Sequence, residues 1–222
     1  ESAALFNFGQ FPYNYTVPDG FKTFSSRNIQ PTYFRATNQP VKTFLSNPKN
    51  HFNTLLYTGT GSANHHITGS EFKPDLVWIK ARTQAYTHLL YDSVRGVGKQ
   101  KYSITSAVEY TNLNNLYSFN SNGFSLGQSG NDDVTNKSGD NFVAWCWKAG
   151  GAAVTNNDGT IATQVSANQK AGFSILTWTG TGADGTIGHG LGKVPGFVII
   201  KNRDRAVEWI VKHQKLNSGH IV

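Results

Sequence analysis

A repeat with a period of 121 residues constrains this chain more than any other feature of its sequence. Residues 52–82 and 173–203 carry the same landmarks in the same order: Phe, an aromatic residue followed by Thr-Gly-Thr-Gly, Ile, Pro, a short apolar run, Lys and Arg. The offset is 121 between the aromatic residues Tyr57 and Trp178 (178 − 57), and it is the same at the Pro and at the closing Arg. Solenoid units are only ~20–50 residues long, so this period indicates a tandem domain duplication.

The repeat divides the chain into three parts. Residues 1–45 match neither repeat and end in a polar stretch with several prolines, which is typical of a linker. A first repeat then spans residues 46–168, and a second repeat spans residues 169–222. A domain that stops a third of the way cannot cover its core, so we expect the polypeptide to continue beyond Val222 or another chain to complete the second repeat. The chain also starts at Glu1 and lacks Met, so we expect an internal stretch of a longer polypeptide.

Composition and local pattern predict an all-β fold. Charged residues are 15% of the chain, against about 25% in an average domain, and the polar quota is filled by Asn, Thr and Ser. Aromatic residues at 13% are too many for a disordered chain, and no segment shows a helical period. Strand-sized runs alternate with turn residues, which favours tandem β-sandwich or jelly-roll-like (concanavalin A-like) domains and excludes coiled coils, helical bundles and collagen.

Several strands can be placed from the sequence. Residues 54–58 and 76–80 are short runs rich in β-formers, and residues 116–119 and 124–126 flank an Asn-Gly dipeptide that predicts a hairpin. The aromatic run at 142–147 is long and apolar enough to predict a central strand.

Charge and apolar patterning argue against two classes of partner. The net charge is +7, which suits an anionic partner, but the basic residues are scattered and form no run longer than two. We therefore expect no nucleic-acid binding. No apolar run approaches the ~18 residues that a membrane span needs, so we expect no membrane insertion.

The sequence offers no convincing cofactor, metal or nucleophile site. The Thr-Gly-Thr-Gly loops lack the Lys and the following helix of a phosphate loop, so they are predicted to be tight turns. His65 and His66 point to opposite faces if they lie on a strand, and no Cys or carboxylate stands at a useful spacing for zinc. Cys146, the only Cys, lies among apolar residues and is predicted to be a buried, inert thiol.

Acidic residues suggest two further sites that we also consider unpromising. The loop with Asp132, Asp133 and Asp140 could offer oxygen ligands to calcium, but it lacks the order of an EF-hand and is predicted to be a solvated turn.

A second acidic set, Glu71, Asp75, Asp92 and Glu109, could hold a glycosidase pair. The position of Asp75 is a glycine in the second repeat, which argues against a catalytic role shared by both repeats. We expect no enzymatic activity.

The candidate interface consists of Lys80, Arg82, Lys201 and Arg203. The two pairs recur in register just after a predicted strand. They are either a solvated strand end or a contact between domains or subunits, because Arg favours interfaces.

The N-terminal part resembles SPRY-type domains, which are concanavalin A-like β-sandwiches. The resemblance lies in FNFGQ at residues 6–10, FPY at 11–13 and PDGFK at 18–22. These segments are similar to the closing strands of such domains. It covers only the last part of a SPRY-type domain, within residues 1–45.

The remainder resembles a domain of unknown function that recurs, often in tandem, in large virion proteins of tailed bacteriophages, especially marine and cyanobacterial phages. The resemblance is carried by PDLVWIK at 74–80, YDSVRGVGK at 91–99, NGFSLG at 122–127 and VAWCWKAG at 143–150. It implies a virion structural protein, such as a tail-fibre, tail-associated or capsid-surface component. Its partners would be other virion proteins and further copies of itself, with a trimer as one option, and it supplies no catalytic residue.

Two other functions stay open from the sequence. The first is a lectin-like module that binds a host glycan or receptor, and the second is a glycan depolymerase. Edge loops rich in Asn, Ser, Thr and Tyr suit the first, since such side chains hydrogen-bond to and stack on sugars.

Overall fold

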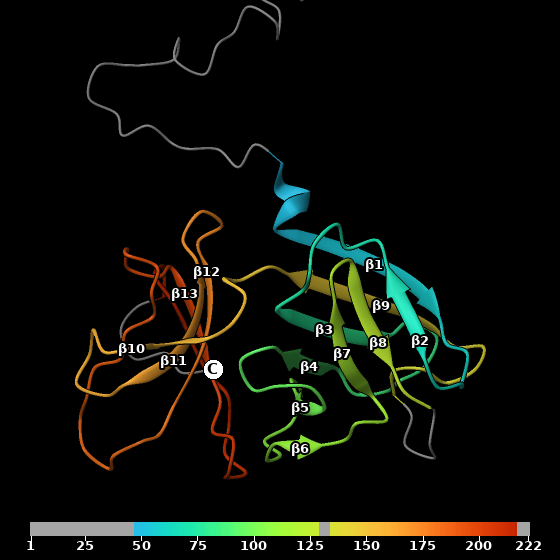
Figure 1. Cartoon of the computed structure of the whole chain (residues 1–222). Helices are drawn as coiled ribbons and strands as arrows, with labels where there is room; N and C mark the ends of the chain where they lie inside the picture. The colour runs from blue at the N-terminus through green and yellow to red at the C-terminus, as the bar shows by residue number, and fades with distance from the viewer. Residues whose placement is uncertain (1–46, 129–133, 217–222) are drawn as a thin grey trace, which may run out of the picture. The chain divides into compact units, whose positions relative to one another are not determined.

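Apart from one 3-10 turn, the regular secondary structure of the described residues consists of β-strands, which confirms the all-β prediction (Figure 1). The computed structural model describes residues 47–128 and 134–216, so the SPRY-like segment and the Pro-containing linker lie outside the described residues. Both repeats belong to one compact unit, Leu45–Val222. The described part holds no helix with the length and apolar character that crossing a membrane requires. Its elements are the 3-10 turn η1 (Pro48–Asn50) and the strands β1 (Phe52–Thr58), β2 (His65–Thr68), β3 (Leu76–Ala81), β4 (Leu89–Asp92), β5 (Lys99–Tyr102), β6 (Tyr110–Thr111), β7 (Leu116–Asn120), β8 (Gly123–Leu126), β9 (Asn141–Trp147), β10 (Val154–Asn156), β11 (Thr163–Asn168), β12 (Phe173–Trp178), β13 (Phe197–Ile200) and β14 (Ile210–His213).

The largest sheet is built around β9. Its strand order is β1-β9-β3-β4-β5-β6, and β9 pairs antiparallel with both β1 and β3, so that Trp147 stands opposite Phe52 on one side and Leu76 on the other. Successive β9 side chains alternate between half-buried and buried, and Phe142 and Cys146 are fully enclosed. The prediction of a central strand at 142–147 is therefore confirmed.

A smaller sheet, in the order β2-β8-β7, covers one face of the large sheet (Figure 1). The core cluster draws on both sheets, with Val77, Tyr91 and Phe142 from the large one and Leu116 and Phe124 from the small one. All five side chains are fully buried. Two sheets that share one apolar core form a β-sandwich.

The predicted hairpin joins β7 to β8. Asn120 pairs with Gly123 across a two-residue turn, and Gly123 has a φ of 146°. A Cβ at this position would lie 1.9 Å from the carbonyl oxygen of Ile67 in β2, so only glycine lets β2 and β8 pair at this point.

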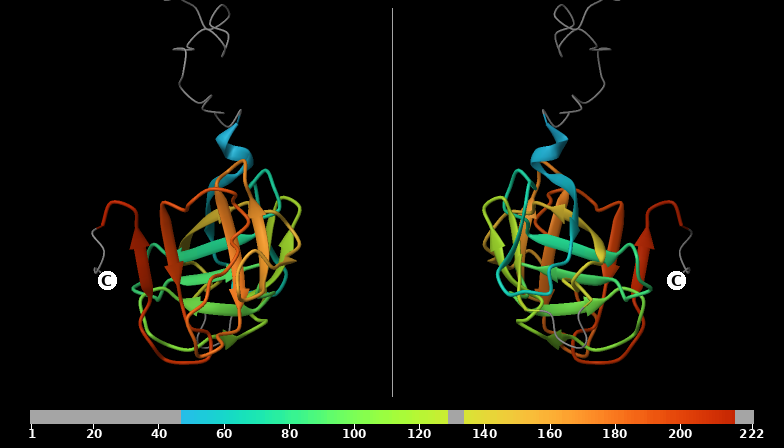
Figure 2. Two further views of the ribbon diagram at one scale, coloured as in Figure 1. Left: turned by 90° about the vertical axis from the view of Figure 1, so that its left-hand side faces the viewer. Right: turned by 90° about the vertical axis from the view of Figure 1, so that its right-hand side faces the viewer.

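Three strands of the second repeat begin 121 residues after three strands of the first. β12, β13 and β14 start at residues 173, 197 and 210, and their counterparts β1, β3 and β4 start at residues 52, 76 and 89. Figure 2 shows β13 and β14 in red beside the orange strands β10 to β12. β12 belongs to the sheet β10-β11-β12, whereas β13 pairs only with β14. The strands β12 and β13 therefore lie in separate sheets, unlike β1 and β3.

The first Thr-Gly-Thr-Gly loop is covered by the segment that leads into β9. The Gly59 amide donates to the Asp140 carbonyl over 2.8 Å, and the Gly61 amide donates to the Asn136 carbonyl over 2.7 Å. Gly59 is buried, whereas Gly180, which occupies the same position in the second repeat, is exposed. A Cβ on Gly59 would lie 2.2 Å from the Lys137 carbonyl oxygen, and one on Gly180 would meet nothing within 4 Å.

We expect Gly59→Ala to lower the free energy of unfolding by about 1–3 kcal/mol, because backbone atoms must move to admit the new methyl group. Gly180→Ala makes the same chemical change in the same motif, and we expect it to change the free energy of unfolding by less than about 0.5 kcal/mol. Urea unfolding of both variants measures the difference. Equal losses in the two variants would contradict this account of the loop.

Candidate functional site

Lys80 and Lys201 perform the same local task in the two repeats. The Lys80 Nζ donates to the carbonyl of the next residue over 2.6 Å and to the carbonyl four positions later over 2.9 Å. The Lys201 Nζ donates to the equivalent two carbonyls over 3.2 and 3.4 Å. In each repeat the lysine therefore closes the loop that follows the strand, since carbonyl oxygens left free by the turn gain a charged donor.

Lys201 also reaches across to the first repeat. Its Nζ donates to the Ser106 carbonyl over 2.9 Å. Burial lowers the pKa of Lys201, and the charge of Glu208 raises it in part. One side chain thus serves both its own loop and a contact between the repeats.

Arg82 and Arg203 occupy equivalent positions but have different surroundings. Arg82 is exposed, and its guanidinium makes no hydrogen bond or ion pair with the residues that the structure describes. Arg203 forms a two-pronged pair with Glu109 of the first repeat, with its Nε 3.1 Å from Oε2 and its Nη2 2.8 Å from Oε1. Such a bidentate geometry fixes orientation as well as adding energy.

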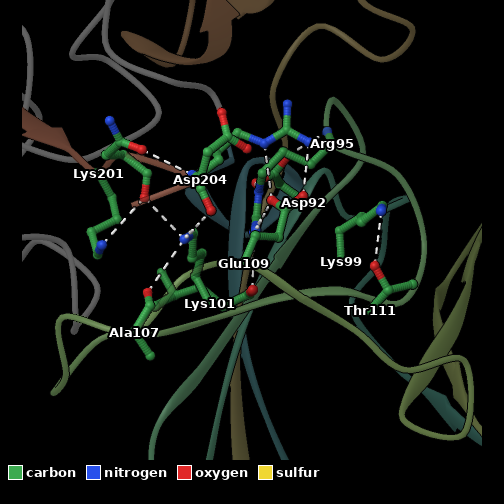
Figure 3. A network of polar contacts seen from close by, with 12 residues as sticks. Asp92, Arg95, Lys99, Lys101, Ala107, Glu109, Thr111, Lys201 and Asp204 are labelled. Carbon is green, nitrogen blue, oxygen red and sulfur yellow. Dashed lines mark hydrogen bonds and ion pairs between the residues drawn. The ribbon is translucent and has the colours of Figure 1, made fainter. Parts of the chain in front are cut away.

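Glu109 is also bonded by Arg95, so a single carboxylate joins two guanidinium groups (Figure 3). The Arg95 Nη1 lies 3.1 Å from Glu109 Oε2, and the Arg95 Nε pairs with Asp92. The side chains of Arg95 and Glu109 are 8% and 9% exposed. Burial raises the pKa of Glu109, but its hydrogen bonds to Arg203 and Arg95 outweigh that effect and leave the pKa below its ordinary value.

Lys101 fixes the backbone of the second repeat within the same network (Figure 3). Its Nζ donates to the carbonyls of Asn202 over 3.0 Å, Arg203 over 3.2 Å and Ala107 over 3.4 Å. Lys101 is 3% exposed. Burial lowers its pKa to about 8, aided by the charge of Lys201 and opposed by that of Glu109.

Two further sets of hydrogen bonds complete this contact. The Glu109 amide donates to the Arg203 carbonyl over 2.7 Å. The Trp209 indole donates to the carbonyls of Tyr102 over 3.1 Å and Thr105 over 3.2 Å. We call the contacts made by Lys101, Glu109, Arg203 and Trp209 the inter-repeat clamp.

The sequence pointed to Arg203 but not to its partners in the clamp. Lys101 lies on β5, a strand of polar residues with no apolar alternation to predict it. Glu109 stood among the candidate glycosidase acids, and only the fold shows that arginines surround it.

Asp75, another of the candidate acids, also makes structural contacts. Asp75 is 2% exposed. Its Oδ1 accepts a hydrogen bond from the Ser93 hydroxyl over 2.8 Å. Its Oδ2 accepts hydrogen bonds from the main-chain amides of Ala149 over 2.8 Å and Gly151 over 3.3 Å. These bonds tie the end of β9 to the start of β3. In the second repeat, Gly196 takes the place of Asp75.

The histidine pair is separated as strand geometry requires. His65 Nδ1 lies 2.7 Å from the Asn136 amide oxygen, and His66 Nδ1 lies 2.7 Å from the Ser125 hydroxyl. Among residues 47–128 and 134–216, no three His, Cys, Asp or Glu side chains gather as metal ligands. Asp132 and Asp133 lie outside the described residues, and Asp140 contacts Thr83 and Gln84.

Cys146 is fully buried in the core, and burial raises its pKa to about 12. Its thiol is therefore protonated at neutral pH, and a protonated, enclosed thiol is a poor nucleophile.

A hollow of about 580 Å³ opens where the segment after β9 meets the turn after β11. The chain neighbours of two lining residues, His51 and Lys148, belong to a row of aromatic rings, in which Trp147 lies 4.9 Å from Phe52 and 6.3 Å from Phe173 between ring centroids. Phe52 is 39% exposed. The hollow is lined by His51, Lys73, Asp75, Lys148, Ala149, Gly150, Gly151, Ala167, Asn168, Gln169 and Lys170.

Comparison with known proteins gives one family. A family model described as a domain of unknown function (DUF7483) matches residues 47–222, which include most of the first repeat and all of the second. No curated protein and no solved structure matches the chain.

We expect Glu109→Gln to lower the free energy of unfolding by about 2 kcal/mol, because a buried arginine loses its charged acceptor. Glu71 is exposed and provides a matched control, since Glu71→Gln makes the same change with an expected effect below about 0.5 kcal/mol. Chemical denaturation of both variants checks this. Identical denaturation midpoints would mean that the clamp contributes nothing to stability.

We expect the free energy of unfolding to rise between about pH 8 and pH 10.5 through Lys101. The folded pKa is about 8 and the ordinary value is 10.5, so in this window the unfolded chain holds a proton that the folded chain has released. Lys101→Met should remove this slope, whereas Lys49→Met, at an exposed lysine, should keep it. Urea unfolding at several pH values compares the three proteins, and an unchanged slope in Lys101→Met would contradict the assignment.

Proposed function

The chain belongs to the DUF7483 family, and from that premise we propose that it is a structural protein of a phage virion. It would be a tail-fibre, tail-associated or capsid-surface component built of tandem β-sandwich domains. The resemblance of the motifs at 74–80, 91–99 and 143–150 to phage virion proteins supports the proposal. Its partners would be other virion proteins and further copies of the same chain.

The inter-repeat clamp is the observation that carries this proposal. Flexible linkers let neighbouring domains move, whereas this contact joins the repeats through the ion pair between Glu109 and Arg203 and through hydrogen bonds to main-chain carbonyls. Separating the repeats would leave Glu109 with Arg95 alone and would take the Asn202 and Arg203 carbonyls from Lys101, and losing partners is costly for buried charges. A stiff series of β-domains is what an extended virion appendage requires.

The acidic residues support a structural role rather than a catalytic one. Asp75 accepts two main-chain amides, Asp92 pairs with Arg95, and Glu109 pairs with two arginines. A glycosidase needs one carboxyl group that holds a proton near neutral pH. Arginine partners favour the charged form of a carboxylate, which suits an ion pair better than a general acid.

A second candidate function is glycan binding at the hollow beside Phe52. Partly exposed aromatic rings offer apolar faces to sugars, and the amide and cationic side chains of Asn168, Gln169 and Lys170 offer hydrogen-bond donors. Such a site would let the same virion component attach to a host surface.

We expect the polypeptide to be present in purified virions of the phage that encodes it. Mass spectrometry of gradient-purified particles detects it, and electron microscopy with an antibody against the chain distinguishes tail from capsid. A polypeptide found in the infected lysate but not in the particles would refute the structural role. If it is present, a glycan array with the wild-type chain and Phe52→Ala decides whether attachment is added to that role.

A further inference from the structure

β13 presents a free edge that corresponds to the edge through which β3 pairs with β9. The Arg82 amide donates to the Asn141 carbonyl over 2.7 Å, at the end of the β3–β9 ladder. Main-chain groups of a strand point alternately to its two sides, so Leu76 and Trp78 also direct theirs toward β9. Their counterparts in the second repeat are Phe197 and Ile199.

The other edge of β13 is already occupied. The Gln214 amide donates to the Gly196 carbonyl over 2.8 Å, and this bond extends the β13–β14 ladder. Even-numbered positions of β13 therefore face β14, and Phe197 and Ile199 direct their N–H and C=O groups to the opposite side. No strand among the described residues pairs with that side.

The side chains on this strand are uncovered as well. Phe197 is 55% exposed and Ile199 is 47% exposed, whereas their counterparts Leu76 and Trp78 are half-buried beside β9. A free edge that carries exposed apolar side chains is a template for another strand. Only the far end of this edge is used, where the Arg203 carbonyl accepts from Glu109.

We propose that β13 docks an extended segment of a partner polypeptide that has the side-chain pattern of β9. The first repeat displays the occupant in place: β9 runs antiparallel to β3 and sets Trp145 opposite Trp78 and Ala144 opposite Ile79. In this pattern Trp145 and Trp147 lie on the outer face, and Phe142, Ala144 and Cys146 face the core. Main-chain bonds provide the affinity, and the alternation sets the register. This docking does not depend on the virion role.

The β9 sequence itself supplies the probe. A fluorescent peptide of residues 139–150, with Cys146→Ser to prevent oxidation, should bind the full 222-residue chain in an anisotropy titration. In β9 the amides of Val143 and Trp145 face β3, and that of Ala144 faces β1. N-methylation at Val143 and Trp145 should weaken binding by more than about tenfold, whereas N-methylation at Ala144 and the substituted position 146 should leave binding nearly unchanged.

Amide hydrogen exchange locates the contact. In the free chain, the amides of Phe197 and Ile199 should exchange faster than those of Leu76 and Trp78. Binding of the peptide should slow exchange at Phe197 and Ile199. Absence of binding, equal binding of the two methylated peptides, or protection elsewhere in the chain would overturn the proposal. So would amides at Phe197 and Ile199 that are already as protected as those of β3.

Discussion

The antiparallel pairing of β9 with two neighbours at once is the interaction on which the rest of the structure depends. β1 and β3 are separated in sequence and meet only through β9, so the large sheet exists only when this strand is in place. The buried face of β9 supplies the middle of the core, and Asp75 then fixes the residues that leave the strand by accepting their amides. A carboxylate that accepts main-chain donors is a strong restraint, because hydrogen bonds to an ionised acceptor are stronger than those between neutral groups. The first repeat is therefore organised from its centre outwards.

The inter-repeat clamp follows a different logic, in which charge replaces apolar burial. One carboxylate, that of Glu109, holds Arg95 of its own repeat and Arg203 of the next, while Lys101 satisfies carbonyl oxygens that the turn after β13 leaves free. Buried polar groups stabilise only when all of them find partners, and here the charged donors meet their acceptors within the same small region. Such a network specifies one arrangement of the repeats more sharply than an apolar patch, which would tolerate sliding.

Most strands of the first repeat can be predicted from the sequence, because their side chains follow the alternation that burial on one face imposes. The run at 142–147 is both the most aromatic and the most central strand, and the Asn-Gly turn forms where its dihedral preference predicts. The contacts of the inter-repeat clamp cannot be predicted from such local patterns. Arg82 and Arg203 occupy the same place in the repeat, yet among the described residues only Arg203 pairs with an acid. Its partner Glu109 lies 94 residues away in the sequence, so no local pattern predicts the pair. β5 carries Lys101 without any apolar period, and its position depends on tertiary pairing with β4 that no local pattern encodes.

The burial of Cys146 makes its sulfur atom a natural reporter of core opening. It is the only thiol in the chain, it lies on β9, and its pKa of about 12 keeps it protonated while the strand is in place. A thiol reagent can reach it only when the sheet opens around β9, so the labelling rate measures how often the centre of the first repeat comes apart. Motion confined to the loops or to the outer strands would leave the sulfur untouched. The chain therefore carries, without any engineering, a probe that separates surface motion from loss of its core.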